Sequence, residues 1–426
     1  MRTTASTPTS EAAASVTLGW EAGEGPRRPA EPWQLSILEF SLATAPLDEL
    51  ERVSATLSPE TIRRLFEACP QVEELAVVRT CHRVEILALH EAGAMSTVRA
   101  MLPGSEEGWR AWTGFSAVHH LHRVSAGLES LATGEREVRE QVQRTATSVH
   151  TRHPRPVIAE LVRGAVAAAR ELDGALSTRR SIAAIASARV LDEMPKPFPR
   201  VVVVGTGTVG RQVAEALGPY ARVTLVYRTA PPPDAYLRST GCRAAPLSDL
   251  VEELAHADAM VAAAKAGERI LSGEDLAGRH ESLVVVDLGL PRNVDPAAGA
   301  LPHIRLVDLE DLYRGSPSNE GDAASDERVR QAAWKSWTAV TPWLTQPQVD
   351  HIMREAERLR RAELDRARAH LGPLTPAQQR AVDHLTRRLT EKLVRSPVQR
   401  LGIPPEETGE GPADLELPTE PRSAGS

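Results

Sequence analysis

The sequence predicts three folded domains: an α/β domain, a doubly wound α/β domain with a parallel sheet, and an all-α domain. In the middle of the chain, hydrophobic strand candidates alternate with helical stretches around a glycine-rich turn at 205–210, as in doubly wound folds. The segment that begins near Trp33 has its own strands and helices, which indicates a separate α/β unit. Residues 326–401 consist almost entirely of helix formers, with basic and acidic side chains interleaved.

Composition and charge agree with a globular protein of several domains. Its 426 residues correspond to about three domains, and its hydrophobic content of 42% and charged content of 25% are ordinary for a soluble protein. The net charge of −7 argues against a surface that is basic throughout, although a local basic patch could still bind nucleic acid. No apolar run reaches the length of about 18 residues that a membrane helix requires, so no membrane contact is expected.

The cysteines give information about the compartment. The chain has an odd number of cysteines, and they are widely spaced, without the spacing of a metal site: Cys69, Cys81 and Cys242. They therefore predict neither a disulfide framework nor a bound metal. A reducing cytoplasm fits this cysteine usage best.

Disordered tails are predicted at 1–32 and 403–426, and the first folded domain is placed at 33–175. In that domain Cys81 falls at a break between two extended segments. From about residue 116 to 172 the pattern is helical. The predicted strands are 35–42, 74–78 and 84–89, and the predicted earlier helices are 47–57 and 59–68.

The second domain, placed at 176–320, contains the glycine-rich turn. Four consecutive valines at 201–204 predict a strand buried on both faces, as in a parallel sheet flanked by helices. The next six residues allow a sharp turn whose backbone approaches a pyrophosphate at the start of a helix, which predicts a Rossmann-like dinucleotide site. A tight turn that binds nothing is the alternative. The six residues are Gly205, Thr206, Gly207, Thr208, Val209 and Gly210; a helix is expected at 182–194, and further strands at 223–227, 260–264, 283–288 and 304–308.

The end of the second strand of this domain predicts which cofactor binds. NAD sites usually have an acidic residue there, which binds the ribose hydroxyls. Here Tyr227 is followed by Arg228 and Thr229, with no acidic residue before Asp234. A cation and a hydroxyl suit a 2′-phosphate, so NADPH is expected, unless Arg228 is merely exposed in a loop.

Cys81 is the candidate nucleophile outside the cofactor domain. It is followed by His82 and Arg83, and a charged His82 or Arg83 would lower the pKa of the thiol and increase its thiolate fraction. A lone cysteine on a strand is more often a core residue. Together with a nicotinamide domain, however, a reactive thiol predicts a reductive acyl-transfer site.

Several motifs now resemble one known family. Residues 80–85 (Thr-Cys-His-Arg-Val-Glu) resemble the Thr-Cys-Asn-Arg-x-Glu signature of glutamyl-tRNA reductases, and residues 119–135 resemble the long central signature of that family. The glycine-rich turn, residues 287–296 and a helical tail with Trp334 and Trp337 are also similar and occur in the same order. The resemblance covers about residues 35 to 402.

This resemblance implies a V-shaped homodimer of three-domain subunits. It implies that 33–175 is a catalytic, substrate-binding domain with the start of a long spinal helix, that 176–320 binds NADPH, and that 321–402 is a helical dimerisation domain. The implied reaction is the NADPH-dependent reduction of glutamyl-tRNA to glutamate 1-semialdehyde, which leads to 5-aminolevulinate and tetrapyrroles. The implied partners are charged tRNA, with glutamyl-tRNA expected first, and a downstream aminomutase.

The family's functional residues can be transferred to matching positions. Cys81 matches the nucleophile that forms a thioester, and His120 matches a histidine important for activity. Arg83 could bind a substrate carboxylate, since its planar guanidinium suits bidentate pairing, and His120 could protonate the leaving ribose oxygen. The neighbouring His119 and His122 compete for the role of His120. The implied substrate-pocket residues are Thr80, His82, Arg83, Ser130, Glu135, Arg136, Glu137 and Gln141, and the NADPH loop is Gly205 to Gly210, followed by Arg228 and Thr229.

The sequence departs from the family in the predicted pocket. His82 replaces an asparagine, Arg136 and Glu137 replace a Pro-Gln pair, and Leu42 stands where the family has a histidine. Cys81 and the glycine-rich turn are intact. Two interpretations therefore remain open beside reduction of glutamyl-tRNA: a paralogue that reduces another aminoacyl-tRNA or a carrier-bound acyl group in specialised metabolism, and a catalytically weak tRNA-binding or regulatory homologue.

Overall fold

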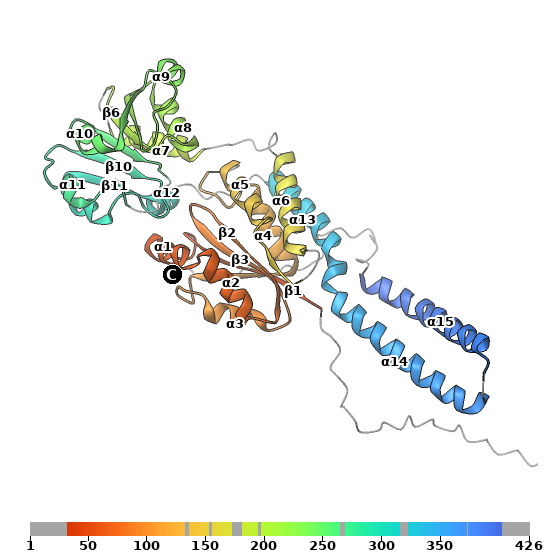
Figure 1. Cartoon of the computed structure of the whole chain (residues 1–426). Helices are drawn as coiled ribbons and strands as arrows, with labels where there is room; N and C mark the ends of the chain where they lie inside the picture. The colour runs from red at the N-terminus through yellow and green to blue at the C-terminus, as the bar shows by residue number, and fades with distance from the viewer. Residues whose placement is uncertain are drawn as a thin grey trace, which may run out of the picture.

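The computed structural model contains an antiparallel α/β domain, a parallel α/β domain and a helical domain that extends away from them (Figure 1). This arrangement confirms the predicted fold class. Nearly all residues of both predicted tails lie outside the described part of the chain. The structure describes residues 32–132, 136–152, 156–172, 181–194, 197–264, 269–315, 323–372 and 374–402.

The first domain is built on a five-stranded antiparallel sheet in the order β4-β1-β3-β2-β5. Both faces are covered by helices, which is why β3 is buried along its whole length. Val84, Ile86 and Ala88 of β3 pack on the side of α1, α2 and α3, whereas Leu87 and Leu89 pack on the side of α4 and α6. The strands are β1 (Gln34–Ser41), β2 (Val72–Arg79), β3 (Arg83–His90), β4 (Trp109–Thr113) and β5 (His150–Thr151); the helices are α1 (Leu47–Thr56), α2 (Pro59–Ala68), α3 (Ala94–Met101), α4 (Gly114–Ser125), α5 (Arg136–Thr145) and α6 (Val157–Glu171).

The predicted helical pattern from about 116 to 172 is confirmed at α4, α5 and α6, but it does not hold in the turn after α4 or at β5. Gly127, with φ of +73°, lies in the turn that follows α4, and its left-handed backbone does not continue a helix. His150 and Thr151 then pair with β2 and extend the sheet by a short strand. Residues 173–180, over which a spinal helix would continue from α6, lie outside the described residues.

The second domain is built on a parallel sheet of six strands in the order β11-β10-β9-β6-β7-β8. The direction of strand succession reverses at β6, with β7 on one side and β9 on the other, so the sheet has a topological switch point there. The sequence did not reveal β8, because this short edge strand contains exposed Arg243 and ends in proline. Its elements are α7 (Ile182–Glu193), β6 (Arg200–Val204), α8 (Thr208–Leu217), β7 (Arg222–Tyr227), α9 (Asp234–Thr240), β8 (Arg243–Pro246), α10 (Leu250–Ala255), β9 (Ala259–Ala262), α11 (Gly273–Ala277), β10 (Leu283–Asp287), β11 (Ile304–Val307) and α12 (Leu309–Gly315).

Three helices form the carboxy-terminal domain: α13 (Ala323–Leu344), α14 (Gln346–Leu371) and α15 (Pro376–Gly402). Helix α13 packs on the first domain, whereas α14 and α15 form an antiparallel pair that projects outward (Figure 1). Arg360 of α14 is buried and donates to Asp383 and Thr386 of α15. Among the described helices, not one combines the length and apolar composition needed to cross a bilayer.

The two α/β domains are joined by an ionic contact at Arg292. This arginine follows β10 and is buried, and its Nη2 lies 2.8 Å from Glu51 Oε2 of α1. It also pairs with Asp48 of α1 and, at 3.5 Å, with Asp308 of its own domain. The backbone N–H of Leu47 donates to Glu310 at 2.9 Å. These contacts fix the loop after β10 against the first domain.

We predict that Arg292→Gln loosens this contact between the domains. Loss of the charge-assisted hydrogen bonds should cost about 1.5–3 kcal/mol and leave the carboxylates of Glu51 and Asp308 without their shared cation. Amide hydrogen exchange in α1 and in residues 288–294 should become about 10- to 100-fold faster. Arg64→Gln removes an arginine whose side chain is 73% exposed on α2, and this control should change exchange little. Unchanged protection in the Arg292 variant would show that other contacts hold the domains.

Candidate active site

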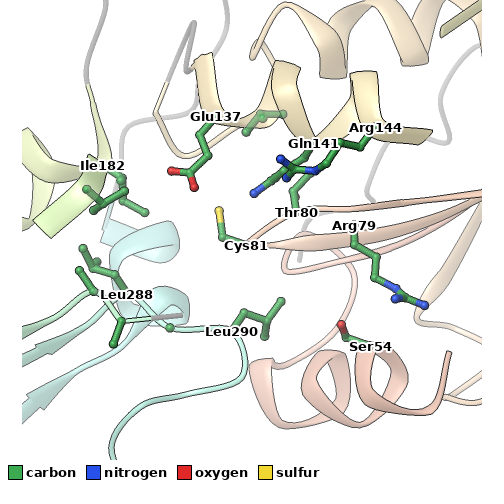
Figure 2. Close-up of a pocket in the computed structure, with 15 residues that line it drawn as sticks. Ser54, Arg79, Thr80, Cys81, Glu137, Gln141, Arg144, Ile182, Leu288 and Leu290 are labelled. Carbon is green, nitrogen blue, oxygen red and sulfur yellow. The ribbon is translucent and has the colours of Figure 1, made fainter. Parts of the chain in front are cut away.

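Cys81 lies in the turn between β2 and β3, at the centre of a cleft of about 450 Å³ (Figure 2). Both α/β domains contribute to the walls, so the thiol faces the domain with the glycine-rich turn. The lining residues of the first domain are Ser54, Arg79, Thr80, Cys81, Glu137, Val138, Gln141 and Arg144; those of the second are Ile182, Val209, Ala263, Ala264, Leu288, Gly289 and Leu290.

Backbone hydrogen bonds hold the turn that carries Cys81. The N–H of Thr80 donates to the carbonyl oxygen of Arg83 at 3.0 Å and closes the turn. The N–H of Leu42, just after β1, donates to the carbonyl oxygen of His82 at 3.1 Å. Because Cys81 stands outside the strand ladders, its side chain is only half-buried and reaches the cleft.

His82 contacts the thiol directly. Its Nδ1 lies 3.2 Å from Cys81 Sγ, and its Nε2 lies 3.1 Å from the carbonyl oxygen of Glu129. A carbonyl can only accept, so Nε2 carries the hydrogen and the lone pair of Nδ1 faces the sulfur. Burial, together with the neighbouring Arg83 guanidinium, lowers the pKa of His82 to about 3. His82 is therefore uncharged near neutral pH, so of the two cations that could act on the thiol, Arg83 is the charged one.

Behind this turn lies a buried network of charges formed by Arg83, Glu39, Glu85 and His120. Arg83 Nη1 lies 3.1 Å from Glu85 and 3.3 Å from Glu39, and Nη2 donates to the carbonyl oxygen of Glu129 at 2.5 Å. His120 Nε2 lies 2.9 Å from Glu85 Oε1. Trp112 donates to Glu39 at 3.0 Å and stacks on the His120 ring with centroids 4.6 Å apart.

The members of this network fix one another's charge states. Burial lowers the pKa of His120, but the carboxylates of Glu85 and Glu39 outweigh it and raise the pKa above its ordinary value. Burial raises the pKa of Glu85, and the contacts with His120 and Arg83 lower it below its ordinary value. Two cations thus balance two anions. The oxygen and nitrogen atoms of Glu39, Glu85 and His120 are close enough together to hold a metal, but Arg83 and His120 together already balance the charge of the two carboxylates.

The glycine-rich turn has the geometry of a dinucleotide site. Gly205 has φ of +111°, and a Cβ there would lie 2.7 Å from the carbonyl oxygen of Ala263. A Cβ on Gly210 would lie 1.9 Å from the carbonyl oxygen of Gly205, so only glycine lets α8 pack this closely. At Gly207, by contrast, a Cβ would meet no atom of the described residues within 4 Å. This open position at the start of α8 fits the approach of a pyrophosphate.

The structure places the predicted site residues in different surroundings. Thr80, Cys81, Glu137, Gln141 and Val209 line the cleft. The side chains of His82, Arg83, His120 and Ser130 are buried and do not line it. Arg228 and Thr229 are exposed after β7, at the edge of the sheet where the glycine-rich turn also lies. Glu135 and the side chain of Arg136 lie outside the described residues.

Two charged cleft residues were not predicted from the sequence: Arg79, at the end of β2, and Arg144 of α5. A signal for Arg144 was present in the sequence. It stands three residues after Gln141 and seven after Glu137, on the same face of a helix. Arg79 directly precedes the cysteine signature but had no such periodicity to mark it.

Domain-family comparisons match nearly the whole folded chain. Residues 38–174 match the glutamyl-tRNA(Glu) reductase amino-terminal domain, and residues 343–411 match the dimerisation domain of the same reductase. Residues 194–314 match the shikimate/quinate 5-dehydrogenase domain. Together with the parallel sheet and glycine-rich turn, these matches define an oxidoreductase-type protein with an NAD(P)-binding Rossmann-like domain and a dimerisation domain.

Full-length relatives make the assignment more specific. Glutamyl-tRNA reductase 2 of a Nocardioides species is 33% identical over 399 residues, which cover 85% of this chain and 88% of the relative. Glutamyl-tRNA reductase of Rubrobacter xylanophilus is 28% identical over 398 residues, covering 86% and 91%. The chain belongs to the glutamyl-tRNA reductase family. A solved structure of the reductase from Methanopyrus kandleri is 22% identical with a TM-score of 0.45, covering 86% of this chain and 94% of that one.

We predict that His120 stabilises the fold in a pH-dependent way. Because its pKa in the folded state is raised above the ordinary 6.5, the folded protein holds the proton more tightly than the unfolded chain does. The stabilisation is complete below pH 6.5 and is lost as pH rises through the folded pKa. At about pH 5.5, His120→Gln should lower the free energy of unfolding by about 3 kcal/mol, and by much less at about pH 9.

Chemical denaturation followed by tryptophan fluorescence can measure this difference, since the parallel domain contains no tryptophan and Trp112 stacks on His120. Replacement of the exposed His280 by glutamine serves as the control and should change stability little at either pH. A loss in the His120 variant that is equal at both pH values would contradict a protonated His120.

Proposed function

We propose that this protein is an NADPH-dependent aminoacyl-tRNA reductase that converts glutamyl-tRNA to glutamate 1-semialdehyde through a thioester on Cys81. One observation carries the proposal: the Cys81 thiol shares a cleft with Val209, Ala263 and Leu288, at the switch point of the parallel sheet. A nucleophile and a dinucleotide site at one cleft suit acyl transfer followed by reduction. Its place in tetrapyrrole biosynthesis belongs to the same proposal.

Acyl transfer begins at Cys81. The sulfur forms a bond to the carbonyl carbon of the ester, and the bond from that carbon to the ribose oxygen breaks. As the sulfur attacks, its proton passes to Nδ1 of His82, whose lone pair already faces it at 3.2 Å. Because the pKa of His82 is lowered to about 3, His82 would not hold this proton at neutral pH but would pass it in the same step to the departing ribose oxygen.

The cofactor would be held at the carboxyl end of the parallel sheet. Gly205, Gly207 and Gly210 would hold the pyrophosphate at the start of α8, and Arg228 with Thr229 would contact the 2′-phosphate. NADPH, when bound, supplies the hydride that releases the acyl group as an aldehyde. The domain contact at Arg292 keeps this edge of the sheet facing Cys81.

Arg83 and His120 act in this proposal as positioning residues. Arg83 donates to Glu39, Glu85 and the Glu129 carbonyl, and these bonds hold it away from the cleft. His120 is bonded to Glu85 on the same side. Both therefore fix the turn that aims the thiol, and Thr80, Glu137 and Gln141 remain as the predicted substrate contacts. Ser130, the remaining predicted substrate-pocket residue, is buried and does not line the cleft.

A second candidate function is supported by the same geometry. The arginine expected to bind the substrate carboxylate is paired internally, and Glu137 lines the cleft where the family has glutamine. Both features suit a paralogue that reduces another aminoacyl-tRNA or a carrier-bound acyl group. A catalytically weak tRNA-binding homologue would show binding without reduction.

We expect a homodimer, since residues 343–411 match a dimerisation domain. Leucine side chains on α14 and α15 are unusually exposed for their size in a single subunit, at 54% for Leu359, 66% for Leu385 and 67% for Leu393. A second subunit would remove them from water. The partners we propose are therefore a second copy of this chain, charged tRNA and an aminomutase that consumes the aldehyde.

We predict that Cys81→Ser abolishes reduction while the fold and NADPH binding remain intact. Serine is almost the same size, but its hydroxyl is a far weaker nucleophile at neutral pH, so the rate should fall by about three orders of magnitude or more. Reduction is measured as loss of nicotinamide absorbance with a panel of charged tRNAs. Without NADPH, the wild type should retain labelled acyl group from the charged tRNA, and hydroxylamine should release it.

Cys242→Ser is the matched control, because Cys242 is buried in the cofactor domain, away from the cleft. This variant should keep its activity and its labelling. Full activity of Cys81→Ser with a competent substrate would rule out the thioester route. A wild type that binds charged tRNA but never forms the adduct would favour the binding homologue.

We also predict that Arg228→Asp reduces affinity for NADPH about 10- to 150-fold and changes affinity for NADH much less, since one charge-assisted contact to the 2′-phosphate is lost. Titration followed by nicotinamide fluorescence measures both constants. Arg238→Asp makes the same charge change at an exposed position of α9 and serves as the control. Equal loss for both cofactors would mean that Arg228 only supports its loop.

A further inference from the structure

The cleft around Cys81 continues into a second hollow of about 390 Å³. The two spaces share Arg79, Gln141 and Arg144, so they form one groove that runs from the thiol along α5. The far part, which has no role in the chemistry described so far, is lined by Pro59, Ile62, Val77, Thr145, Ser148 and His150.

Two arginines without a counter-ion lie where the two hollows meet. Among the described residues, neither Arg79 nor Arg144 has an ion pair, and Nε of Arg79 is buried without a hydrogen-bond partner. Burial alone lowers the pKa of Arg79, with no anion to offset it. Elsewhere in the described chain, buried arginines such as Arg83 and Arg292 have carboxylate partners. The partly desolvated Arg79 guanidinium, with its open Nε donor, is therefore prepared for an external anion, and the exposed Arg144 adds a second positive charge to the same two hollows.

Charged side chains of helix α5 make the two ends of the groove opposite in charge. Glu137, Gln141 and Arg144 lie on one face, so negative charge stands beside Cys81 and positive charge stands farther along (Figure 2). An aminoacyl ester has matching charges, with an ammonium group on its acyl side and phosphates on its ribose side. In Figure 2 the Arg79 side chain points away from Cys81, on the side of Ser54, so its charge lies apart from the thiol.

We propose that Arg79 and Arg144 form a phosphate-binding subsite for the single-stranded 3′ end that carries the aminoacyl ester. This inference rests on the proposed function and adds the path of the nucleotide strand. The groove extends beyond both arginines, which suits a strand of several anions better than one acyl carboxylate. His150 lines the far part and packs against Phe66 with ring centroids 5.7 Å apart, so an aromatic surface for a base follows the cations.

The test measures binding without chemistry. Full-length Cys81→Ser protein is titrated, by fluorescence anisotropy, with a labelled uncharged RNA hairpin that ends in a single-stranded 3′ tail, and with the same hairpin lacking the tail. Adding Arg79→Gln or Arg144→Gln should weaken binding of the tailed hairpin about tenfold each at low salt. Each should also reduce the slope of log affinity against log salt by about 0.7. Arg163→Gln, at a position 59% exposed on α6, should change neither quantity.

The other outcomes separate the possible explanations. If the groove variants bind the tailed hairpin as tightly as their parent, the subsite is wrong even though tRNA binding stands. If they bind it normally but raise the KM of the Cys81-containing enzyme for charged tRNA, the arginines contact the acyl carboxylate instead, and the phosphate subsite is again wrong. If the parent binds neither hairpin, the proposed tRNA reductase function fails together with this inference. Unchanged thermal unfolding and NADPH binding of the variants would show that they remain folded.

Discussion

The buried contact between Arg83 and the carboxylates of Glu39 and Glu85 is the interaction on which the site depends. It connects β1 with β3 beneath the turn that carries Cys81, and through His120 it extends to α4. A buried charge without a partner is strongly unfavourable, so each member of the set requires the others. The turn that carries Cys81 is therefore supported by buried charged side chains that are paired with one another. These side chains do not line the cleft, which is formed by other residues.

The second requirement is that two separately folded α/β units face each other. The switch point of the parallel sheet lies at the carboxyl end of the central strand β6, and the loop after β10 carries Arg292 into contact with α1. Leu290 of this loop packs against apolar side chains of both domains. This loop, together with the contact between Leu47 and Glu310, keeps the thiol and the dinucleotide turn facing each other.

Much of the fold could be predicted from the sequence because its signals were local. The valine run before Gly205 and the alternation around Cys81 predicted their strands, since burial pattern and turn chemistry act over a few residues. The end of α4 and strand β5 were missed because they depend on Gly127 and on pairing with a distant strand. The uncharged state of His82 depends on burial beside Arg83, and the exposure of Arg79 to the cleft depends on packing against the second domain. No local pattern encodes those relations.

The charges along α5 limit which substitutions could alter the substrate selectivity of this protein. Glu137 stands in the first turn of the helix and Arg144 in the last, so each also interacts favourably with the helix dipole. Reversing the two charges would reverse the polarity of the groove and at the same time weaken the helix that forms its wall. A change of substrate preference by substitution of these charged residues is therefore limited by the stability of the helix. Substitution of the neutral Gln141 can change selectivity without affecting the interaction with the helix dipole.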